Sequence, residues 1–230
     1  MNAVVEVDLW AWSLDPSAHA IARHAALLDH DERQRAGRFL NERHGSRFVV
    51  GRGGMRLRLA QYLQKSPGAL VFSYGPQGKP MLADAGAPHF NLAHSDGEAV
   101  LAICREQPVG VDVERGHRLD MDIVSRFFSE AEIAAWQLLP DAARERAFFR
   151  AWTAKEAVLK ALGVGLSVPL SAFSVHISAD EPLHLQSAPQ GAASPETWSL
   201  QEFTPVPDYY GTLAIAAPRV SITWRSLPES

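Results

Sequence analysis

Hydrophobic and polar residues alternate near the start of the chain. The stretch VVEVDLWAW places Val5, Val7, Leu9 and Ala11 on one face, and the turn-forming residues SLDPS follow it. A repeat of two residues is typical of a half-buried β-strand. We therefore expect the fold to begin with a strand.

Helical periodicity replaces this alternation in two later segments of the first half. One runs from about Ile21 to Phe39, and the other covers SRFVVGRGGMRLRLAQYL. Three glycines weaken the second segment, because each costs roughly 1 kcal/mol relative to alanine inside a helix. The pattern still predicts two helices, followed by a strand at ALVFSY and a loop at GPQGKP.

Two apolar segments in the middle of the chain, EAVLAIC and VGVDVE, are separated only by REQP. This spacing predicts a β-hairpin. Asp112 and Glu114 lie at its end, two residues apart, so both carboxylates should project from one face. They form either the exposed polar face of an edge strand or a site whose ligand offsets their repulsion.

The second half begins with a helix signal. Ser129 followed by Glu132 has the spacing of a capping box, so a helix should begin at Ser129 and end before Pro140. A longer helix should run from a capping Asp141 to Leu162, with Gly163 left-handed just beyond it. Strands are expected at SAFSVHIS and, as a closing antiparallel pair, at WSLQEFTPV and GTLAIAA.

Composition limits the partners. A chain of 230 residues that is 47% hydrophobic can bury a core as one domain or as two small lobes. Its net charge of -4 gives no general attraction to nucleic acid or to an anionic membrane, so an anion site needs a local concentration of cations. The single Cys104 excludes a disulfide framework, and no segment suggests a signal peptide or membrane span, which together favour the cytoplasm.

The long second-half helix carries a stripe of chemistry-bearing residues. Trp152, Glu156 and Lys160 follow one another at intervals of four residues. Taken alone, Glu156 and Lys160 are compatible with a surface ion pair that stabilises the helix by about 0.3 to 0.5 kcal/mol. Together with Asp112 and Glu114, however, Glu156 completes three carboxylates, a hard-oxygen set that suits Mg²⁺ and a phosphate ligand.

Cations for such a ligand are few. The chain has only four lysines, and three of them fall in the segments described above: Lys79, Lys155 and Lys160. Arg35 and Arg47 lie on the N-terminal helices, and His94 lies in the polar turn NLAHSDG. Solvated helix charge and local hydrogen bonding are the alternatives to ligand binding for these residues. A zinc site is not expected, because Cys104 has no partner and no second histidine falls at metal spacing.

Four separate motifs, GKP, NLAHS, GVDVE and WTAKEAVLKALG, occur in the order found in 4′-phosphopantetheinyl transferases. The chain resembles the two-lobed class typified by the surfactin-synthetase-activating enzyme, and the resemblance extends from ERQRAGRF to DYYGTLAIAA. It implies an α+β fold of two similar α/β lobes, residues 1–108 and 109–230. These would form an internal pseudo-dimer with antiparallel sheets and a long helix in each lobe, which favours a monomer.

The resemblance also implies a reaction. A serine of an apo acyl or peptidyl carrier protein attacks the β-phosphate of coenzyme A, and 3′,5′-adenosine bisphosphate leaves. The implied Mg²⁺ ligands are Asp112, Glu114 and Glu156, with Glu156 or a water as general base and Lys160 offsetting charge on the leaving oxygen. The implied coenzyme A contacts are Arg35, Arg47, Lys79, His94, Lys155 and Lys160. Ala93 replaces the usual serine of the NLAHS motif, so one hydrogen bond to the nucleotide should be missing.

Two other functions stay open at this point. A non-catalytic module that docks on carrier proteins would have no reason to keep three repelling carboxylates. Another Mg²⁺-dependent phosphoryl-transfer enzyme or nuclease would be expected to show a GxxxxGK[ST] loop or a basic aromatic groove, and the chain has neither. The carrier itself is not specified; Phe127, Phe128 and Trp136 form either part of a docking patch or part of the core.

Overall fold

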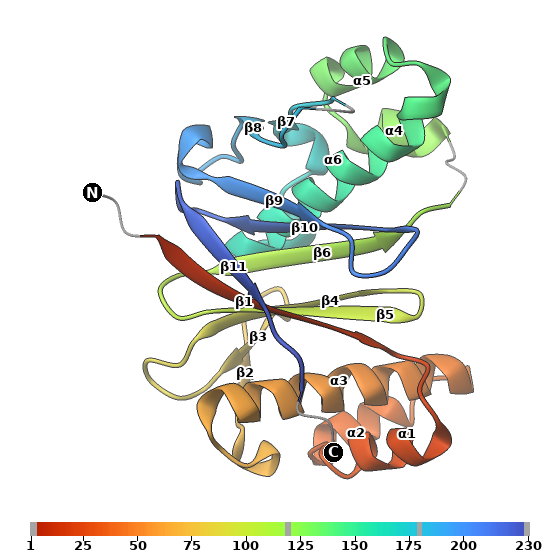
Figure 1. Cartoon of the computed structure of the whole chain (residues 1–230), viewed down its shortest axis with the longest axis vertical. Coiled ribbons are helices and arrows are strands. Elements are labelled where there is room, and N and C mark those ends of the chain that lie inside the picture. The colour runs from red at the N-terminus through yellow and green to blue at the C-terminus, as the bar shows by residue number, and fades with distance from the viewer. Residues whose placement is uncertain (1–3, 118–120, 179–180, 228–230) are drawn as a thin grey trace.

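The computed structural model describes residues 4–117, 121–178 and 181–227. Its first half contains β1 (Val5–Ser13), α1 (Ala18–Ala25), α2 (His30–Ala36), α3 (Glu42–Leu63), β2 (Phe72–Tyr74), β3 (Pro80–Leu82), β4 (His89–Ser95) and β5 (Glu98–Cys104). The second half contains β6 (Val109–Arg115), α4 (Met121–Phe127), α5 (Glu130–Gln137), α6 (Asp141–Leu162), β7 (Ser174–Val175), β8 (Leu185–Ser187), β9 (Ser199–Phe203), β10 (Tyr209–Ile215) and β11 (Val220–Trp224). Figure 1 shows the two halves stacked, each with a sheet toward the middle and a long helix outside.

The strands form two main sheets with matching topology. The first has the order β11-β1-β5-β4 and the second the order β6-β10-β9. If β11 is left aside, the two orders correspond. In each sheet the last strand of the half, β5 or β10, lies between the first, β1 or β6, and the middle one, β4 or β9. All of these pairs are antiparallel. The predicted α+β pseudo-dimer of two similar lobes is therefore confirmed.

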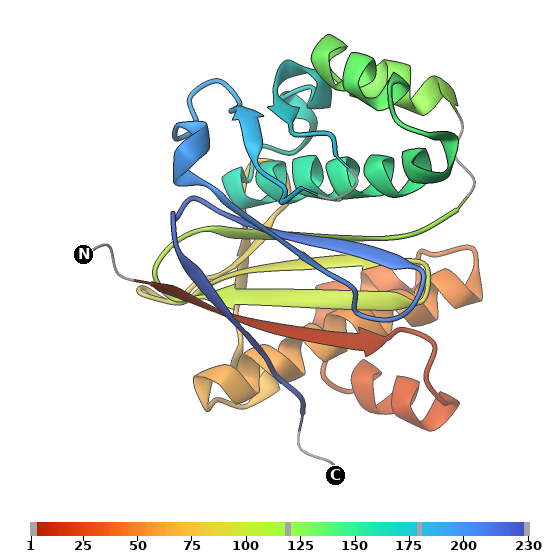
Figure 2. The ribbon, with the colours of Figure 1, turned by 45° about the horizontal axis from the view of Figure 1, so that its top comes forward.

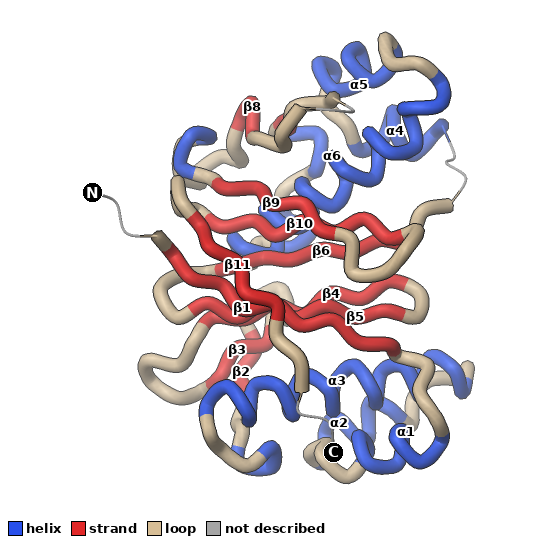
Figure 3. The backbone as a smooth tube through the Cα atoms, viewed as in Figure 1, coloured by secondary structure: helices blue, strands red, loops and turns tan. Residues whose placement is uncertain are grey.

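Four layers follow one another through the molecule: α3, the first sheet, the second sheet and α6 (Figures 2 and 3). The inner faces of the two sheets pack on each other through small and branched apolar residues, Val7 and Leu9 on one side and Val111, Val113 and Leu213 on the other. The predicted apolar face of β1 thus lies in the centre of the protein. Because this core is apolar, the polar residues of β6 must face the helix layer.

A buried ion pair is repeated in the two halves. Glu32 belongs to the capping box of α2 and pairs with Arg56 of α3, with 2.6 Å between Oε2 and Nε. Glu132 belongs to the capping box of α5 and pairs with Lys155 of α6. Counted from the first residue of each helix, Glu42 in α3 and Asp141 in α6, Arg56 and Lys155 occupy the same position. The correspondence is a further sign that the two halves share one architecture.

Two predicted elements are wrong. The segment from Ile21 to Phe39 is two helices, because the Asp29 side chain accepts a hydrogen bond from the Glu32 backbone amide and starts α2 anew. The predicted hairpin of EAVLAIC and VGVDVE does not form, since β5 lies between β1 and β4 in the first sheet while β6 pairs with β10 in the second. The REQP connection therefore crosses between sheets.

The glycines of α3 allow close packing. A Cβ on Gly53 would lie 2.7 Å from the carbonyl oxygen of His24, and one on Gly54 would lie 2.6 Å from Nε1 of Trp12. Side chains at these positions would separate α3 from α1 and from β1. The local cost in helix propensity is offset by burial against these elements.

The ends of α6 follow the prediction only in part. Gly163 adopts the expected left-handed conformation after the helix, with φ of 69°. Pro140, however, occupies the N-cap position, so Asp141 is the first helical residue and does not cap the helix.

The C-terminal strand crosses back to the first sheet. β11 pairs in parallel with β1, and Nε of Arg225 lies 2.6 Å from Oδ1 of Asp8. The expected division assigned this strand to the lobe of residues 109–230, whereas its pairing places it with the first half. Among the helices of the described residues, none has the length and apolarity needed to cross a membrane.

Candidate active site

The site is built where α6 lies directly on β6. A Cβ on Gly110 would come within 1.9 Å of the Ala157 carbonyl oxygen, so only glycine permits this approach. Asp112 and Glu114 follow on the same face of β6 and point toward α6, while the intervening valines pack between the sheets. Asp112 is only 3% exposed, so the interpretation of an exposed edge strand is wrong for this residue.

Asp112 is a buried carboxylate with one oxygen satisfied. Its Oδ1 accepts a hydrogen bond from Nζ of Lys160 at 2.5 Å, whereas its buried Oδ2 has no hydrogen-bond partner among the residues that the structure describes. Burial raises the pKa of Asp112 to about 7, and the charges of Glu114 and Glu156 add to this while Lys160 opposes it. Asp112 therefore has an unused ligand atom in a place where extra positive charge is favourable.

Glu156 and Glu114 complete the predicted acidic set. Glu156 lies one turn before Lys160 on α6 and is half-buried. Burial raises its pKa, with a further contribution from Glu114 and an opposing one from Lys160. Glu114 accepts a hydrogen bond from Oγ of Ser95, at 2.6 Å from Oε2. The structure thus brings Asp112, Glu114, Glu156 and Lys160 within electrostatic reach of one another.

These side chains fit a divalent cation by their chemistry. Carboxylate oxygens are the donors that Mg²⁺ prefers, and the unpartnered Oδ2 of Asp112 is a free donor. Within the described ranges, no three acidic, imidazole or thiol groups already stand in the close arrangement of a metal centre. In this state, the ammonium group of Lys160 supplies the charge that neutralises Asp112.

A pocket of about 600 Å³ lies beside the acids and gathers cationic groups. Its lining consists of Leu14, Arg35, Phe39, His44, Arg47, Phe48, His94 and Asp96. The Arg35 guanidinium lies over the Phe48 ring, 5.2 Å from its centroid. Desolvation lowers the pKa of His94, followed by repulsion from Lys160, which links this pocket to the acidic set. Three predicted coenzyme A contacts, Arg35, Arg47 and His94, therefore meet in one place.

Arg47 is the most constrained of these cations. Its Nε and Nη2 donate to the two carboxylate oxygens of Asp15 at 2.8 and 2.7 Å, and its Nη1 donates to Asp96 at 2.9 Å. A guanidinium has five N–H donors, so two stay available for a ligand. Two donors suit a bidentate contact with a phosphate.

Lys79 lies at the other end of the site and holds α6. Its ammonium donates to the carbonyl oxygens of Lys160 at 2.5 Å, Val109 at 3.2 Å and Ala161 at 3.5 Å. Desolvation lowers the pKa of Lys79 to about 8. All three N–H donors have acceptors within the protein, so in this conformation the ammonium anchors the C-terminal end of α6 and offers nothing to a nucleotide.

Lys155 lies in the core and not at the site, contrary to the prediction. The residue is fully buried, and its ammonium donates to the Glu132 carboxylate and to the Phe173 carbonyl oxygen. One residue along a helix turns the side chain by about 100°, so Lys155 points into the core while Glu156 faces the site. The predicted nucleotide contact from Lys155 does not fit this position.

Removal of the Lys155 ammonium should destabilise the fold. Lys155→Ala leaves the carboxylate of Glu132 buried without its cation, and we expect a loss of about 3 kcal/mol in the free energy of unfolding. The double variant Lys155→Met with Glu132→Leu should recover most of this loss, because it removes both charges. Urea unfolding followed by circular dichroism measures both values, and a loss below about 1 kcal/mol for the single variant would contradict a buried ion pair.

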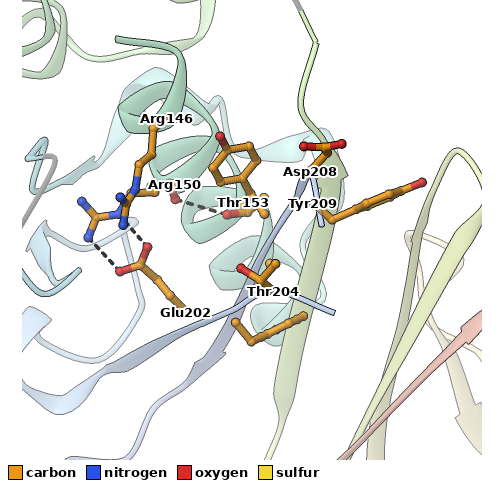
Figure 4. Close-up of a pocket in the computed structure, with 10 residues that line it drawn as sticks. Arg146, Arg150, Thr153, Glu202, Thr204, Asp208 and Tyr209 are labelled. Atoms are coloured by element: carbon orange, nitrogen blue, oxygen red, sulfur yellow. Dashed lines mark hydrogen bonds and ion pairs between the residues drawn. The ribbon is translucent and has the colours of Figure 1, made fainter. Parts of the chain in front are cut away.

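The N-terminal half of α6 is anchored by residues that the sequence did not single out. Arg150 makes a two-bond ion pair with Glu202 of β9 at 2.6 and 2.7 Å, at the wall of a pocket of about 450 Å³ (Figure 4). Thr153 and Thr212 join their hydroxyls at 2.8 Å, and Thr212 is the sheet partner of Asp112. No spacing rule links Arg150 to Glu202, since they meet only through the fold.

The aromatic residues near α5 belong to the core. Phe128 and Trp136 are 3% and 2% exposed, and half-buried Phe127 packs edge-on against Trp152. Phe128 and Trp136 are thus not available for docking a carrier.

Over the part of the chain that the structure describes, the acidic set exists in only one of the two repeated halves. Leu57 and Gln61 stand at the positions in α3 that Glu156 and Lys160 occupy in α6, counted from the start of each helix. In the first half, Trp12 of β1 packs against Arg58 and the α3 backbone at Gly54. The duplicated fold therefore carries this constellation once.

The chain resembles known proteins over nearly its whole length. Residues 11–106 match the N-terminal part of 4′-phosphopantetheinyl transferase, and residues 108–217 match the 4′-phosphopantetheinyl transferase superfamily. The chain is 38% identical over 217 residues to the 4′-phosphopantetheinyl transferase HetI of Nostoc sp. (strain PCC 7120), which covers 92% of this chain and 88% of HetI. It is 30% identical over 158 residues to the transferase Sfp of Bacillus subtilis (strain 168), which covers 69% and 70% of the two chains. The protein therefore belongs to the two-domain 4′-phosphopantetheinyl transferases, enzymes that activate carrier proteins with the phosphopantetheine of coenzyme A.

Proposed function

We propose that the chain transfers 4′-phosphopantetheine from coenzyme A to a serine of an apo acyl or peptidyl carrier protein in a Mg²⁺-dependent reaction that releases 3′,5′-adenosine bisphosphate. The observation that supports this most is the meeting of Asp112, Glu114 and Glu156 with Lys160 beside a pocket rich in cations. A monomer suffices, because the two halves of one chain provide both sides of the site. We place the reaction in the cytoplasm.

The metal would be held by Asp112, Glu114 and Glu156. When bound, Mg²⁺ supplies a Lewis acid that neutralises the pyrophosphate of coenzyme A. With a cation to neutralise Asp112, Lys160, whose side chain is 31% exposed, would be free to donate to the oxygen that leaves with the adenosine bisphosphate.

The proton of the attacking serine needs an acceptor. Glu156 has a raised pKa and lies at the same surface as Lys160, so it accepts this proton directly or through a water. The serine O–H bond breaks and its oxygen bonds to the β-phosphorus, while the bond from that phosphorus to the bridging oxygen breaks. The electron pair leaves with the nucleotide, toward Lys160.

The nucleotide end of coenzyme A would occupy the pocket of Arg35, Arg47 and His94. Two free N–H groups on Arg47 suit a phosphate, and the lowered pKa of His94 favours a neutral imidazole that stacks or hydrogen-bonds. Ala93, next to His94 on β4, points to the opposite face and is buried in the apolar core between the sheets, so the expected loss of a hydrogen bond to the nucleotide does not follow from its position.

Removal of divalent metal should abolish transfer. The purified protein, incubated with coenzyme A, Mg²⁺ and a panel of apo carrier proteins, should yield holo carriers by mass spectrometry. Excess chelator after extensive dialysis should stop the reaction, because the buried carboxylates and the pyrophosphate then repel one another. Added Mg²⁺ or Mn²⁺ should restore it, and full activity in chelator would rule out the metal site.

Lys160 should act on turnover more than on binding. Lys160→Ala should lower kcat by about 100-fold with a much smaller rise in KM for coenzyme A, since charge on the leaving oxygen grows only in the transition state. Steady-state kinetics measure both constants. Lys65→Ala is the matched control, because its ion pair with Asp84 is exposed and lies within the first half. A raised KM with unchanged kcat would assign Lys160 to substrate binding instead.

A further inference from the structure

The end of β4 and the turn that leads to β5 belong to the first half of the chain but contact the acidic strand of the second. Oγ of Ser95 donates to Oε2 of Glu114 at 2.6 Å and accepts from the backbone amide of Arg115 at 3.2 Å. Because the hydroxyl accepts from that amide, its single proton is directed at the Glu114 carboxylate. Ser95 is thus locked in both of its hydrogen-bonding roles.

Asp96 makes a second connection from the same turn. Its Oδ2 accepts from Nη1 of Arg115 at 2.6 Å, and its Oδ1 accepts from Nη1 of Arg47 at 2.9 Å. One carboxylate therefore joins the end of β6 to the cationic pocket. The backbone amide of Gly97 donates to the hydroxyl of Tyr209 at 3.3 Å, so the last residue of β4 and the two turn residues after it all contact the second half.

Glu114 needs such support. It lies near the end of β6, is only half-buried, and shares its surroundings with two other carboxylates. Repulsion from Asp112 and Glu156 favours rotation of its side chain toward water. The hydrogen bond from Ser95 opposes that rotation and keeps the carboxylate beside the others.

We propose, on the basis of the function proposed above, that Ser95 and Asp96 are positioning residues for the transfer. Ser95 holds Glu114 in place as a metal ligand, and Asp96 holds Arg47 in place for the nucleotide while tying that pocket to the acidic strand. Neither side chain needs to touch the reacting atoms. Groups that orient metal ligands in this way typically change metal affinity by about 10- to 100-fold when removed.

The first test measures Mn²⁺ binding without coenzyme A, from the electron paramagnetic resonance signal of free Mn²⁺. Ser95→Ala should weaken the Kd for Mn²⁺ about 10-fold, and Ser95→Thr, which keeps the hydroxyl, should stay within about 3-fold of wild type. Ser66→Ala is the control, since Ser66 is exposed and its hydroxyl caps nothing. Thermal midpoints of all variants report whether the fold is intact.

The second test measures how Asp96→Asn binds 3′,5′-adenosine bisphosphate, because charge and positioning predict opposite effects on this binding. By charge alone, Asp96→Asn removes a negative group beside an anion pocket and should tighten the binding of 3′,5′-adenosine bisphosphate. By positioning, the same change weakens one of the three hydrogen bonds that hold Arg47, leaving the two to Asp15, and should weaken that binding about 5-fold, with a higher KM for coenzyme A and little change in kcat. Asp84→Asn is the matched control, because its ion pair with Lys65 lies away from the pocket.

Asp112→Asn in the Mn²⁺ assay distinguishes a failure of the proposed metal site from a failure of the proposed role of Ser95. Equal binding by wild type and Asp112→Asn would overturn the metal site and the Ser95 role with it. Loss of binding in Asp112→Asn, with wild-type affinity in Ser95→Ala, would overturn the Ser95 role alone. Loss in both with recovery in Ser95→Thr supports it. Tighter nucleotide binding in Asp96→Asn overturns the role of Asp96.

Discussion

Asp112→Asn should reduce phosphopantetheine transfer by about 100-fold or more while leaving the metal-free protein at least as stable as wild type. The substitution keeps the shape of the side chain and removes its charge. Oδ2 of Asp112 is the unused buried donor of the site, and an amide at this position is a poor ligand for Mg²⁺. The loss should appear mainly in the metal dependence of the reaction.

The expected stability of metal-free Asp112→Asn relative to wild type follows from the pKa of Asp112. Burial raises the folded-state value from 3.8 to about 7. The folded protein therefore binds more protons than the unfolded chain between these values, so the contribution of Asp112 to stability falls as pH rises from 3.8 to about 7 and stays low above it. Asparagine carries no charge and avoids this penalty, while the partly exposed Lys160 ammonium is solvated by water instead.

The measurement compares thermal midpoints of metal-free wild type and Asp112→Asn at pH 6 and pH 8, beside transfer assays. The advantage of the variant should be larger at pH 8, where Asp112 is ionised. Asp141→Asn is the control, because Asp141 is exposed at the start of α6, where it pairs with Arg144. Wild-type transfer by Asp112→Asn would mean that the metal site must be sought elsewhere in the chain.

The sequence predicted best what local chemistry decides. The alternation of β1, the capping box at Ser129 and the left-handed Gly163 each depend on a few neighbouring residues, and the structure contains all three. The break at Asp29 is also local, but the helical periodicity on both sides of it concealed the capping box with Glu32. A search for capping boxes inside long periodic segments would have found it.

Strand pairing was harder to predict, because it depends on the whole fold. A four-residue connection between two apolar segments allows a hairpin but does not require one. The preferred partner of β6 is β10, whose Thr212 stands opposite Asp112 although it lies far along the chain. No window around VGVDVE contains that information.

The site residues also divide into those that local spacing predicts and those that only the whole fold brings together. Asp112 and Glu114 on one strand face, and Glu156 and Lys160 on one helix face, follow from periods of two and four residues. Helix geometry also excludes Lys155 from the face of Glu156, because adjacent helical residues point about 100° apart. Ser95 and Asp96 meet Glu114 and Arg115 only because β4 and β6 belong to sheets that pack together, so no spacing rule could reveal them.

Gly110→Ala should cause the largest loss of stability of any single methyl group added to this site, about 3 kcal/mol or more in the free energy of unfolding. The added Cβ would lie 1.9 Å from the carbonyl oxygen of Ala157 and 2.4 Å from the amide nitrogen of Ala161. Both are backbone atoms of α6, so no side-chain rotation relieves the contact. The helix itself must move away from β6.

That movement is resisted at the C-terminal end of the helix and near its middle. Lys79 holds the C-terminal carbonyl groups, and Arg150 is paired with Glu202 in the N-terminal half. The added methyl group therefore either strains the contacts between α6 and β6 or breaks the contacts of Lys79 and Arg150. In the second case, Lys160 and Glu156 shift relative to Asp112. In either case, Gly110→Ala should lower the urea midpoint and also weaken Mn²⁺ binding, because the ligands no longer converge.

Gly68→Ala gives the matched control for this prediction. Gly68 has no atom within 4 Å of its added Cβ, so its replacement should change stability by less than about 0.5 kcal/mol. Urea unfolding of both variants isolates the effect of the α6 contact from the general effect of replacing glycine. A Gly110→Ala protein with the wild-type midpoint would show that α6 and β6 are farther apart than this fold requires. The convergence of the three carboxylates with Lys160 would then lose its structural basis.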